Sequence, residues 1–370
     1  MSKQTPLYQA HLDNGAKMGP FAGYDMPLYY SEGVMAEHEW VREHAGIFDV
    51  SHMGQVILSG ENAMAFLERI TPSSFGKLPD GRAKYTVMTN DKGGIVDDLI
   101  VTRMASDQFF AVINAGCKDK DIAWMREHLP SAVDMQVLDD RALVALQGDA
   151  AETVMRDLFG MDLSEIPYMW LIEASLHDGT DVYVSRLGYT GEDGFEISVP
   201  ANKARALWDK LLSHDKVKPI GLAARDSLRL EMGYCLYGHD IDDTTSPVEA
   251  GLGWVMGKEN TGFIGAGHVL GHKEDGVDRQ RVGIRLTEKG VAREGVDILD
   301  AQSMEKIGTL TSGGFSPSLK GGVGQGYVQT DKAESGTKVF VNVRGRNIAA
   351  EVADMPFIPA RTKSMKKKAA

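Results

Sequence analysis

Two adjacent carboxylates interrupt a segment, from Gly93 to Ile100, whose other residues are typical of a buried β-strand. An ionised group in apolar surroundings costs free energy unless it is paired or used, so we expect at least one Asp to face a polar cavity, a cation or a basic partner. Successive strand side chains point to opposite faces, which places Asp98 with Val96 on one face and Asp97 on the other. Only one of the two carboxylates can face a given cavity.

A third carboxylate, Glu196, alternates with Phe195 and Ile197 in a predicted strand that follows the turn 191–194. Two interpretations remain open from this pattern. Glu196 is either a solvated strand carboxylate or a cavity residue that accepts two N–H bonds from a planar ligand with an amidine-like edge. The alternation by itself does not decide between them.

A predicted helix over residues 221–233 carries Arg225 and Arg229 on a stripe beside its apolar face. Arginines in that position need acidic partners or an anionic ligand. A structural ion pair with Asp226 or with a neighbouring domain is one interpretation, and an anionic ligand is the other.

The remaining chemically suggestive residues have ordinary interpretations. We expect His52 to be a hydrogen-bonded structural residue, and Tyr85, Tyr189, Tyr237 and Trp254 to pack in the core or line an aromatic-accepting pocket. The chain has no HExxH or CxxC motif and no His-rich cluster, so no metal site is predicted. The glycines of 321–326 lack the spacing of a nucleotide-binding loop, so neither nicotinamide nor ATP is predicted.

The elements that must position these residues are strands and helices in irregular order. We predict a hairpin over 84–103, a strand over 109–114, a helix over 118–128, a strand over 141–147, a helix over 150–159, and strands over 181–187 and 194–199. This order lacks the regular alternation of a doubly wound parallel sheet. The predicted fold class is therefore α+β.

The C-terminal part has a different character. From residue 281 onward the sequence has short strands with frequent glycine turns, over 282–286, 306–310, 326–328, 338–343 and 348–352. Such spacing indicates a small all-β barrel or sandwich. We therefore predict a region 1–270 of two interleaved α+β lobes, a polar linker over 271–280, and a C-terminal barrel domain over 281–370 with a basic tail.

Composition restricts the class of protein. The 370 residues are 43% hydrophobic and 25% charged, with a formal net charge of -12, which argues against a nucleic-acid or anionic-membrane surface. The basic tail over 361–368 is predicted to be a solvated end. The two cysteines fit reduced cytosolic thiols. No signal-like segment and no long apolar run is present, so we expect a cytoplasmic protein with no membrane and no nucleic-acid partner.

Ten segments, in order through nearly the whole chain, resemble the glycine cleavage system T-protein family of tetrahydrofolate-dependent aminomethyltransferases. They are Gly19–Tyr24, Phe48–Met53, Gly93–Ile100, Asn114–Lys118, Leu146–Gly148, Gly188–Ser198, Gly221–Glu231, Thr245–Glu249, Thr311–Gly314 and Met355–Pro359. The resemblance implies a three-domain cloverleaf around a central folate cavity, with a β-barrel as the last domain.

The resemblance also implies roles for particular residues. The family's catalytic aspartate matches Asp98 rather than Asp97, its pteridine-holding glutamate matches Glu196, and a folate-contacting arginine matches Arg225. Further pocket residues implied by the resemblance are Tyr85, Asn114 and Trp254. Family members often carry a folate-contacting tyrosine shortly after the Met-Pro-Phe-x-Pro run. This chain has 360–363 as Ala-Arg-Thr-Lys, so Arg361 is a candidate to replace that contact.

The implied substrates are an aminomethyl group on the dihydrolipoyl arm of the lipoylated H-protein, and tetrahydrofolate as co-substrate. The implied reaction changes no oxidation state, so no metal, nicotinamide or flavin is expected. Two rival interpretations remain. One is a folate-dependent demethylase, or a folate module like those of dimethylglycine- and sarcosine-oxidising enzymes. The other is a folate-binding protein without transferase activity, like the iron–sulfur assembly factors. An attached flavin domain would mark the first, and we expect no room for one in this chain. A Lys-Gly-Cys-containing motif would mark the second, and the sequence has no match to it.

Overall fold

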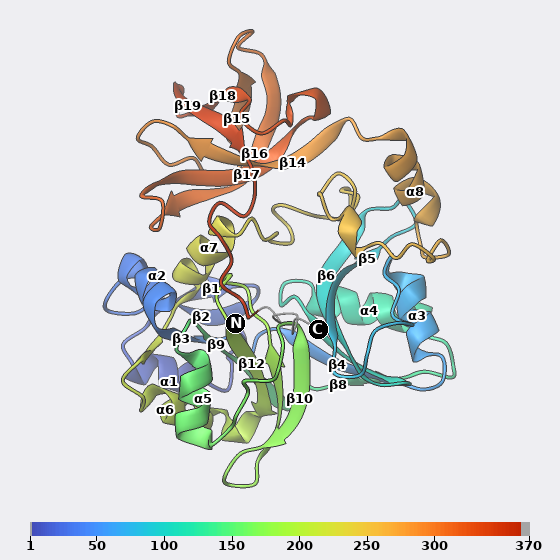
Figure 1. Cartoon of the computed structure of the whole chain (residues 1–370), viewed down its shortest axis with the longest axis vertical. Helices are drawn as coiled ribbons and strands as arrows, with labels where there is room; N and C mark the ends of the chain where they lie inside the picture. Colours follow the sequence, from blue (N-terminus) through green and yellow to red (C-terminus); the bar gives the residue numbers. More distant parts are fainter. Residues whose placement is uncertain (1, 364–370) are drawn as a thin grey trace, which may run out of the picture.

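The computed structural model describes residues 2–363 and arranges them in three lobes (Figure 1). One lobe is built on a six-stranded sheet, the second on a five-stranded antiparallel sheet, and the third is a closed six-stranded barrel. The barrel lies at the top of Figure 1, above the two sheet lobes. The α+β class and the C-terminal barrel predicted from the sequence are confirmed.

The six-stranded sheet has the strand order β10-β11-β12-β9-β3-β13, with β13 parallel to β3. Its strands are β3 (Ala45–Asp49), β9 (Arg141–Gln147), β10 (Trp170–Ser175), β11 (Asp181–Arg186), β12 (Gly194–Pro200) and β13 (Val217–Pro219). One face packs on apolar residues of helices, including Val154 and Trp208. The helices of this lobe are α1 (Tyr8–Asp13), α2 (Val34–Glu43), α5 (Ala151–Phe159), α6 (Ala204–Leu212) and α7 (Leu222–Glu231), with the short 3-10 helix η1 (Ala201–Lys203).

The five-stranded sheet has the order β5-β6-β7-β4-β8. Its strands are β4 (Gly54–Ser59), β5 (Ala83–Thr89), β6 (Ile95–Ala105), β7 (Gln108–Ile113) and β8 (Asp134–Val137). Helices α3 (Ala63–Ile70) and α4 (Lys118–His128) cover one face through Phe66 and Met125. The other face meets the six-stranded lobe in a shared core that includes Phe110, Leu143 and Leu228. The two sheet lobes therefore pack against each other through this shared apolar core.

The remaining elements connect and complete these lobes. A small hairpin is formed by β1 (Lys17–Phe21) and β2 (Tyr24–Tyr29), and the 3-10 helix η2 (Gly253–Val255) packs against β5. The chain crosses from β3 into the five-stranded sheet and returns at β9, so the two lobes are interleaved along the sequence.

The barrel closes in the order β14-β17-β16-β15-β18-β19 around apolar side chains such as Ile284 and Val341. Its strands are β14 (Arg279–Leu286), β15 (Asp297–Asp300), β16 (Lys306–Ser316), β17 (Gly321–Gln329), β18 (Lys338–Val343) and β19 (Arg346–Ala353), and η3 (Thr330–Lys332) follows β17. The glycine-rich run 321–326 lies in β17. A Cβ atom on Gly326 would come within 2.3 Å of the Thr309 carbonyl oxygen, so glycine allows β16 and β17 to pack closely there.

The predicted linker over 271–280 is wrong for most of its length. Helix α8 (Ala266–Asp275) continues through its first half, and β14 begins at Arg279, which leaves only 276–278 as a connection. The helix is anchored by Ala266 and Val269, which are buried against the five-stranded lobe. Its later turns are polar and exposed, and that surface character made the segment resemble a linker.

Residues 364–368 of the predicted basic tail lie outside the described residues. Within residues 2–363, no helix combines the length and the apolar character needed to cross a membrane.

Candidate active site

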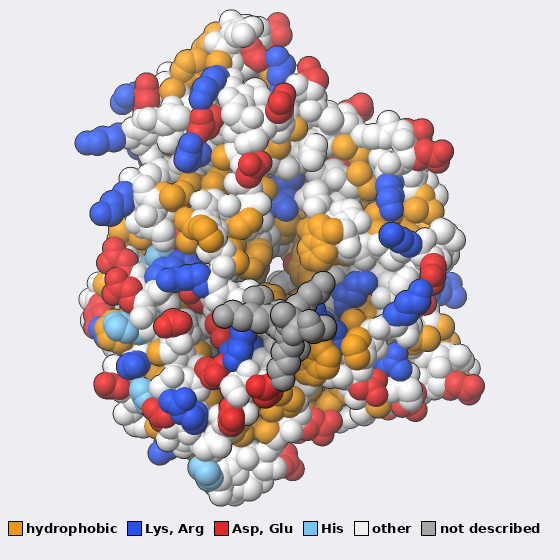
Figure 2. All heavy atoms as spheres, in the orientation of Figure 1, with side chains coloured by type: hydrophobic (Ala, Val, Ile, Leu, Met, Phe, Trp, Pro, Cys, Tyr) orange, Lys and Arg blue, Asp and Glu red, His pale blue; other side chains and the backbone are white. Residues whose placement is uncertain are grey.

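A cavity of about 1020 Å³ lies where the three lobes meet. Its walls include Asp98 from β6, Glu196 from β12, Arg225 from α7 and Arg281 from β14. Figure 2 shows a narrow opening between the lobes near the middle of the molecular face, bordered by hydrophobic side chains. The volume is in the range of pockets that enclose a cofactor-sized molecule.

The Asp98 carboxylate faces this cavity, as strand alternation predicts, and both of its oxygens are partnered. Oδ2 accepts a hydrogen bond from the Tyr85 hydroxyl at 3.0 Å, and Oδ1 accepts one from Asn114 Nδ2 at 2.8 Å. Burial, followed by the negative charge of Asp97, raises the pKa of Asp98 to about 7. A carboxyl group in this state changes its charge near neutral pH.

The hairpin turn before β6 places Asp98 at this point. The Asn90 side-chain oxygen accepts hydrogen bonds from the N–H groups of Lys92 and Gly94, at 2.9 and 3.0 Å. This closes the turn, and beyond a register shift between Met88 and Thr89 the strands pair so that Asp98 lies opposite Val87. An Asn that bonds its own backbone two residues on is typical of such turns.

Asn114 and Tyr85, both predicted pocket residues, orient the carboxylates of β6. Asn114 Nδ2 lies 2.8 Å from Asp98 Oδ1 and 3.0 Å from Asp97 Oδ1. The Tyr85 ring stacks on Trp254, with ring centroids 5.6 Å apart. Trp254 is 66% exposed, so its ring forms part of the cavity rim rather than its floor.

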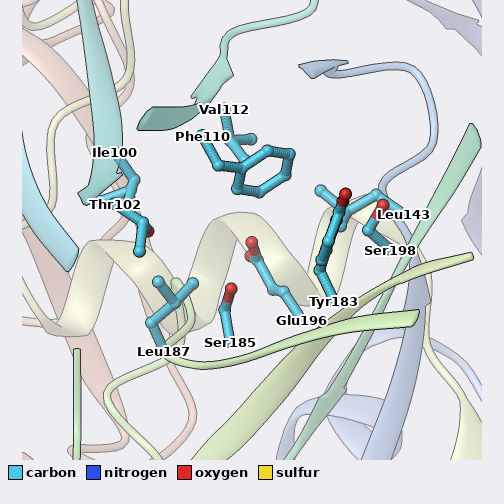
Figure 3. Close-up of a pocket in the computed structure, with 10 residues that line it drawn as sticks. All are labelled: Ile100, Thr102, Phe110, Val112, Leu143, Tyr183, Ser185, Leu187, Glu196 and Ser198. Atoms are coloured by element: carbon cyan, nitrogen blue, oxygen red, sulfur yellow. The ribbon is translucent and has the colours of Figure 1, made fainter. Parts of the chain in front are cut away.

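Glu196 lies between the main cavity and a small pocket of about 10 Å³ (Figure 3). Figure 3 shows its carboxylate pointing into the space between apolar side chains, including Phe110 and Leu187, and the hydroxyls of Ser185 and Tyr183. Burial raises the pKa of Glu196, and the charge of Arg225 partly offsets this rise. The interpretation of Glu196 as a solvated strand carboxylate is therefore wrong, because the residue is 7% exposed.

Arg225 and Arg229 have different environments although they are neighbours on α7. Arg229 is a structural residue that pairs with Asp226 and Asp240, each at 2.8 Å. The Arg225 guanidinium lines the cavity and lies over the Tyr189 ring, 4.9 Å from its centroid. Within residues 2–363 its Nη1 has no hydrogen-bond partner, and burial lowers its pKa. This donor is free for an anionic or carbonyl group of a ligand.

His52 is a cavity residue that sequence reasoning placed wrongly. Its ring lines the cavity and makes an edge contact with Phe21, with centroids 5.7 Å apart. Its Nδ1 has no hydrogen-bond partner in the part of the chain that the structure describes. Burial lowers its pKa to about 4, which keeps the imidazole neutral at physiological pH. The predicted hydrogen-bonded structural histidine is thus not observed, although the residue lies in one of the segments of the family resemblance.

Arg281 was missed altogether, because it comes from the first strand of the barrel. Its guanidinium lines the cavity and donates to the carbonyl oxygens of Ala250 and Gly233, at 2.8 and 2.9 Å. No local pattern in a barrel strand indicates that one arginine reaches a neighbouring lobe.

Arg361 does not replace the tyrosine contact of the family. Its guanidinium donates to the Glu192 carboxylate at 2.7 Å and to the Arg42 carbonyl oxygen at 2.6 Å. Glu192 is buried and also pairs with Arg42. Because Arg361 is bound to this carboxylate, its side chain does not line the cavity.

Three lobes around a cavity of this size, with a buried carboxyl group whose pKa is raised, define a class of protein with a cofactor-sized pocket where its domains meet. Two family models match the chain: the GCVT N-terminal domain over residues 7–260, and the glycine cleavage T-protein C-terminal barrel domain over residues 279–358. The chain belongs to the glycine cleavage T-protein family.

Known proteins resemble the chain over nearly its full length. An aminomethyltransferase of Flavobacterium psychrophilum is 46% identical over 359 residues, covering 96% of this chain and 99% of that relative. A mitochondrial aminomethyltransferase of Dictyostelium discoideum is 41% identical over 382 residues, covering 98% and 94%. The crystal structure of glycine cleavage system aminomethyltransferase T from Bartonella henselae superposes with a TM-score of 0.93 at 41% identity, covering 98% of this chain and 100% of that one.

Proposed function

We propose that this chain transfers the aminomethyl carbon from the dihydrolipoyl arm of a lipoylated H-protein to tetrahydrofolate, with release of ammonia. The product is 5,10-methylenetetrahydrofolate. The chain is an enzyme of the aminomethyltransferase class, as its full-length relatives are. The structural observation that supports the proposal best is the Asp98 carboxyl group, which titrates near neutral pH inside a cavity large enough for a folate.

The proposed chemistry balances without any redox step. The nitrogen lone pair of S–CH2–NH2 expels the dihydrolipoyl thiolate and leaves a methylene-iminium cation. N5 of tetrahydrofolate attacks this carbon, and the proton it loses balances the thiolate, which becomes the dihydrolipoyl thiol. N10 then attacks the same carbon, its proton passes to the departing nitrogen, ammonia leaves, and the five-membered ring closes. The oxidation state of the carbon is unchanged, so the reaction needs neither a hydride acceptor nor an electron carrier.

We assign Asp98 to stabilising the cation and orienting the folate nitrogens. An anionic carboxylate in a water-poor site interacts strongly with developing positive charge. Tyr85 and Asn114 fix both of its oxygens, so little reorganisation is needed when the cation forms. Its pKa near 7 also allows it to take up a proton from N5 or N10.

We assign Glu196 and Arg225 to binding the folate. Glu196 presents a buried carboxylate that matches the two N–H groups of an aminopyrimidine edge. Arg225 keeps an unpartnered donor in the cavity, which suits a carbonyl or carboxylate of the folate. Trp254, at the rim, offers an aromatic face on which a second ring can stack.

Three statements remain predictions: the H-protein partner, the division into a folate-binding region and a barrel domain, and the cytoplasmic location. Only the connection between the two regions has been revised, to residues 276–278.

The experiment that tests the function is an assay of ammonia release from aminomethylated H-protein. We expect release that depends on added tetrahydrofolate and is accompanied by formation of 5,10-methylenetetrahydrofolate. H-protein without its lipoyl group is the control and should give no product. Tetrahydrofolate binding without any ammonia release would contradict the transferase and favour a folate-binding protein.

A further inference from the structure

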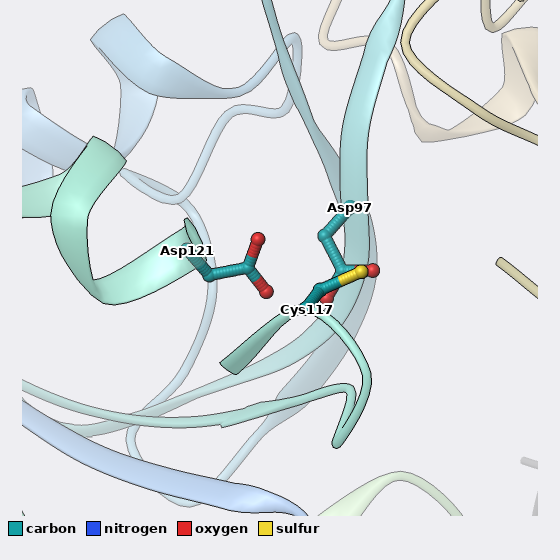
Figure 4. Close-up of side chains that lie close together, drawn as sticks. All are labelled: Asp97, Cys117 and Asp121. Atoms are coloured by element: carbon teal, nitrogen blue, oxygen red, sulfur yellow. The ribbon is translucent and has the colours of Figure 1, made fainter. Parts of the chain in front are cut away.

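A second cluster of chemically active side chains lies behind Asp98, where Asp97 and Asp121 lie away from the cavity and Cys117 lies at its edge. The cluster consists of three buried residues: Asp97 on β6, Cys117 directly before α4, and Asp121 in the first turn of α4. One oxygen or sulfur atom of each lies within 4.8 Å of the others. Figure 4 shows the two carboxyl groups and the thiol turned toward one another.

The two carboxyl groups differ in how they are satisfied. Asp97 Oδ2 accepts a hydrogen bond from the Asn114 backbone N–H at 3.1 Å, and its Oδ1 accepts one from Asn114 Nδ2 at 3.0 Å. Asp121 is completely buried, and within residues 2–363 neither of its oxygens has a hydrogen-bond partner. A buried acceptor with no donor is costly, and a second negative charge beside Asp97 would add repulsion.

The nearby cation does not resolve this imbalance. The Lys120 ammonium group donates to the Val96 carbonyl oxygen and, at 2.8 Å, to the Tyr237 hydroxyl. The Asp121 carboxyl group therefore lacks a donor, and a proton shared between the two carboxyl groups would supply one.

We propose that Asp97 and Asp121 share a single proton and act together as a buried positioning pair behind Asp98. In this pair Asp121 carries the proton and donates a hydrogen bond to Asp97. The Asp97 carboxylate still accepts its hydrogen bonds from Asn114. Because Asn114 also binds Asp98, the pair fixes the amide that orients the cavity carboxylate.

The electrostatic surroundings agree with this arrangement. Burial, and then the charge of Asp97, raises the pKa of Asp121 to about 11, whereas Lys120 acts in the opposite direction. Burial also raises the pKa of the Cys117 thiol, so it stays protonated and adds no charge. The titratable groups that face the pair are Asp98, Cys117, Lys120 and Tyr237.

The pair has a consequence for the reaction, and this part rests on the proposed function. Sharing one proton leaves the pair with a single negative charge, and this charge contributes to the raised pKa of Asp98. Asp97 and Asp121 are positioning residues, because neither lines the cavity.

Isotope-edited infrared spectroscopy of protein with 13C-labelled aspartate carboxyl groups tests the shared proton directly and needs no substrate. At pH 9 Asp98 is ionised, so we expect a remaining protonated-carboxyl band in the wild type that is absent in Asp121→Asn. The absence of such a band in the wild type at pH 9 would overturn the proposal.

Unfolding as a function of pH provides a second measurement. The raised pKa of Asp121 means that the folded state binds one more proton than the unfolded state between pH 6 and pH 8, so its stabilisation is lost as pH rises. We expect the folding equilibrium constant of the wild type, relative to Asp121→Asn, to fall about tenfold per pH unit. Asp119→Asn removes an exposed carboxylate from the same helix and is the matched control. Parallel curves for the wild type and Asp121→Asn would contradict the shared proton.

Activity and metal content complete the test. Asp97→Asn removes the charge behind Asp98, so the acidic limb of the kcat/KM profile should move down by about one pH unit, whereas Asp119→Asn should leave it in place. Two carboxylate oxygens and a thiol sulfur are also donors for a borderline cation such as Zn²⁺. A stoichiometric metal that copurifies with the wild type and is lost in Asp121→Asn would overturn the shared proton.

Failure of the wild type to release ammonia would count against the proposed function alone, because the infrared and unfolding results do not depend on it.

Discussion

The charge state of Asp98 is the chemical property on which the proposed site depends. Burial and the neighbouring Asp97 raise its pKa to about 7, so the carboxyl group loses its negative charge as pH falls through neutrality. Because the ionised form stabilises the iminium cation, kcat/KM should decrease about tenfold per pH unit on the acidic side of this pKa.

Replacing Asp98 by Asn keeps the size of the side chain and removes its charge. We expect turnover to fall by about 100-fold or more, whereas tetrahydrofolate affinity stays within roughly tenfold, because the charge acts mainly in the transition state. Steady-state assays and calorimetry measure the two effects separately. Normal turnover in Asp98→Asn would remove this residue from the mechanism.

Glu196 should affect binding before it affects turnover. A hydrogen bond to a charged group contributes about 1.5–3 kcal/mol, so Glu196→Ala should weaken tetrahydrofolate binding by roughly tenfold to a hundredfold in calorimetry. Glu173→Gln changes an exposed carboxylate on β10 of the same sheet and should leave affinity unchanged. A Glu196→Ala variant that binds as tightly as the wild type would exclude this residue from the folate contact.

The β5–β6 hairpin holds the catalytic strand against the segment that follows α7. The Ile95 N–H donates to the Thr245 carbonyl oxygen at 3.0 Å, and Asn90 Nδ2 donates to the Asp243 carbonyl oxygen at 2.8 Å. Gly94 lies directly at this contact. A Cβ atom there would be 1.8 Å from the Asp243 oxygen, so no side chain fits without movement of the backbone.

We therefore expect Gly94→Ala to lower the free energy of unfolding by about 1–3 kcal/mol through overpacking, and to reduce activity by displacing Asp98. Chemical denaturation and the ammonia assay measure the two effects. Gly267→Ala in helix α8 is the matched control, because its Cβ would meet no atom within 4 Å. Alanine should stabilise that helix by about 0.5–1 kcal/mol. Equal stability of the two variants would contradict the proposed close contact.

Across the whole molecule, a buried ion network joins the barrel to the six-stranded lobe. The Glu231 carboxylate at the end of α7 accepts hydrogen bonds from Arg42 on α2 at 2.7 Å and from Ser316 of the barrel at 2.6 Å. Burial opposes its ionisation, but His38, Ser316 and Arg42 outweigh burial and lower the pKa of Glu231 to about 2. The network therefore connects α2 and α7 to the barrel through one buried carboxylate.

Glu231→Gln should destabilise the protein by about 3 kcal/mol at pH 7, because Arg42 then loses a buried charged partner. A lowered pKa stabilises the fold above the unfolded-state value of 4.5, and this contribution is lost as pH falls toward 2. The difference from the wild type in urea denaturation should therefore shrink between pH 5 and pH 3. Glu305→Gln, an exposed change on the barrel, is the control. A difference that stayed constant over this range would contradict the assigned ionisation.

Local sequence patterns determined the elements that carry the site. Strand alternation separated Asp98 from Asp97, and the periodicity over 118–128 matched helix α4 from end to end. The order of matching segments indicated the family, and with it the folate-binding roles proposed for Glu196 and Arg225. These features are readable because strand and helix periodicities, turn residues and motifs are properties of neighbouring residues.

Only the tertiary structure decided which side chains share a space. His52 and Arg281 line the cavity although they come from different lobes. Asp121 lies close to Asp97 although the two are 24 positions apart in sequence. Helix α8 takes the place of a predicted linker because two buried residues anchor an otherwise polar segment. Burial and long-range electrostatics depend on how the lobes pack, and no short window of sequence contains that information.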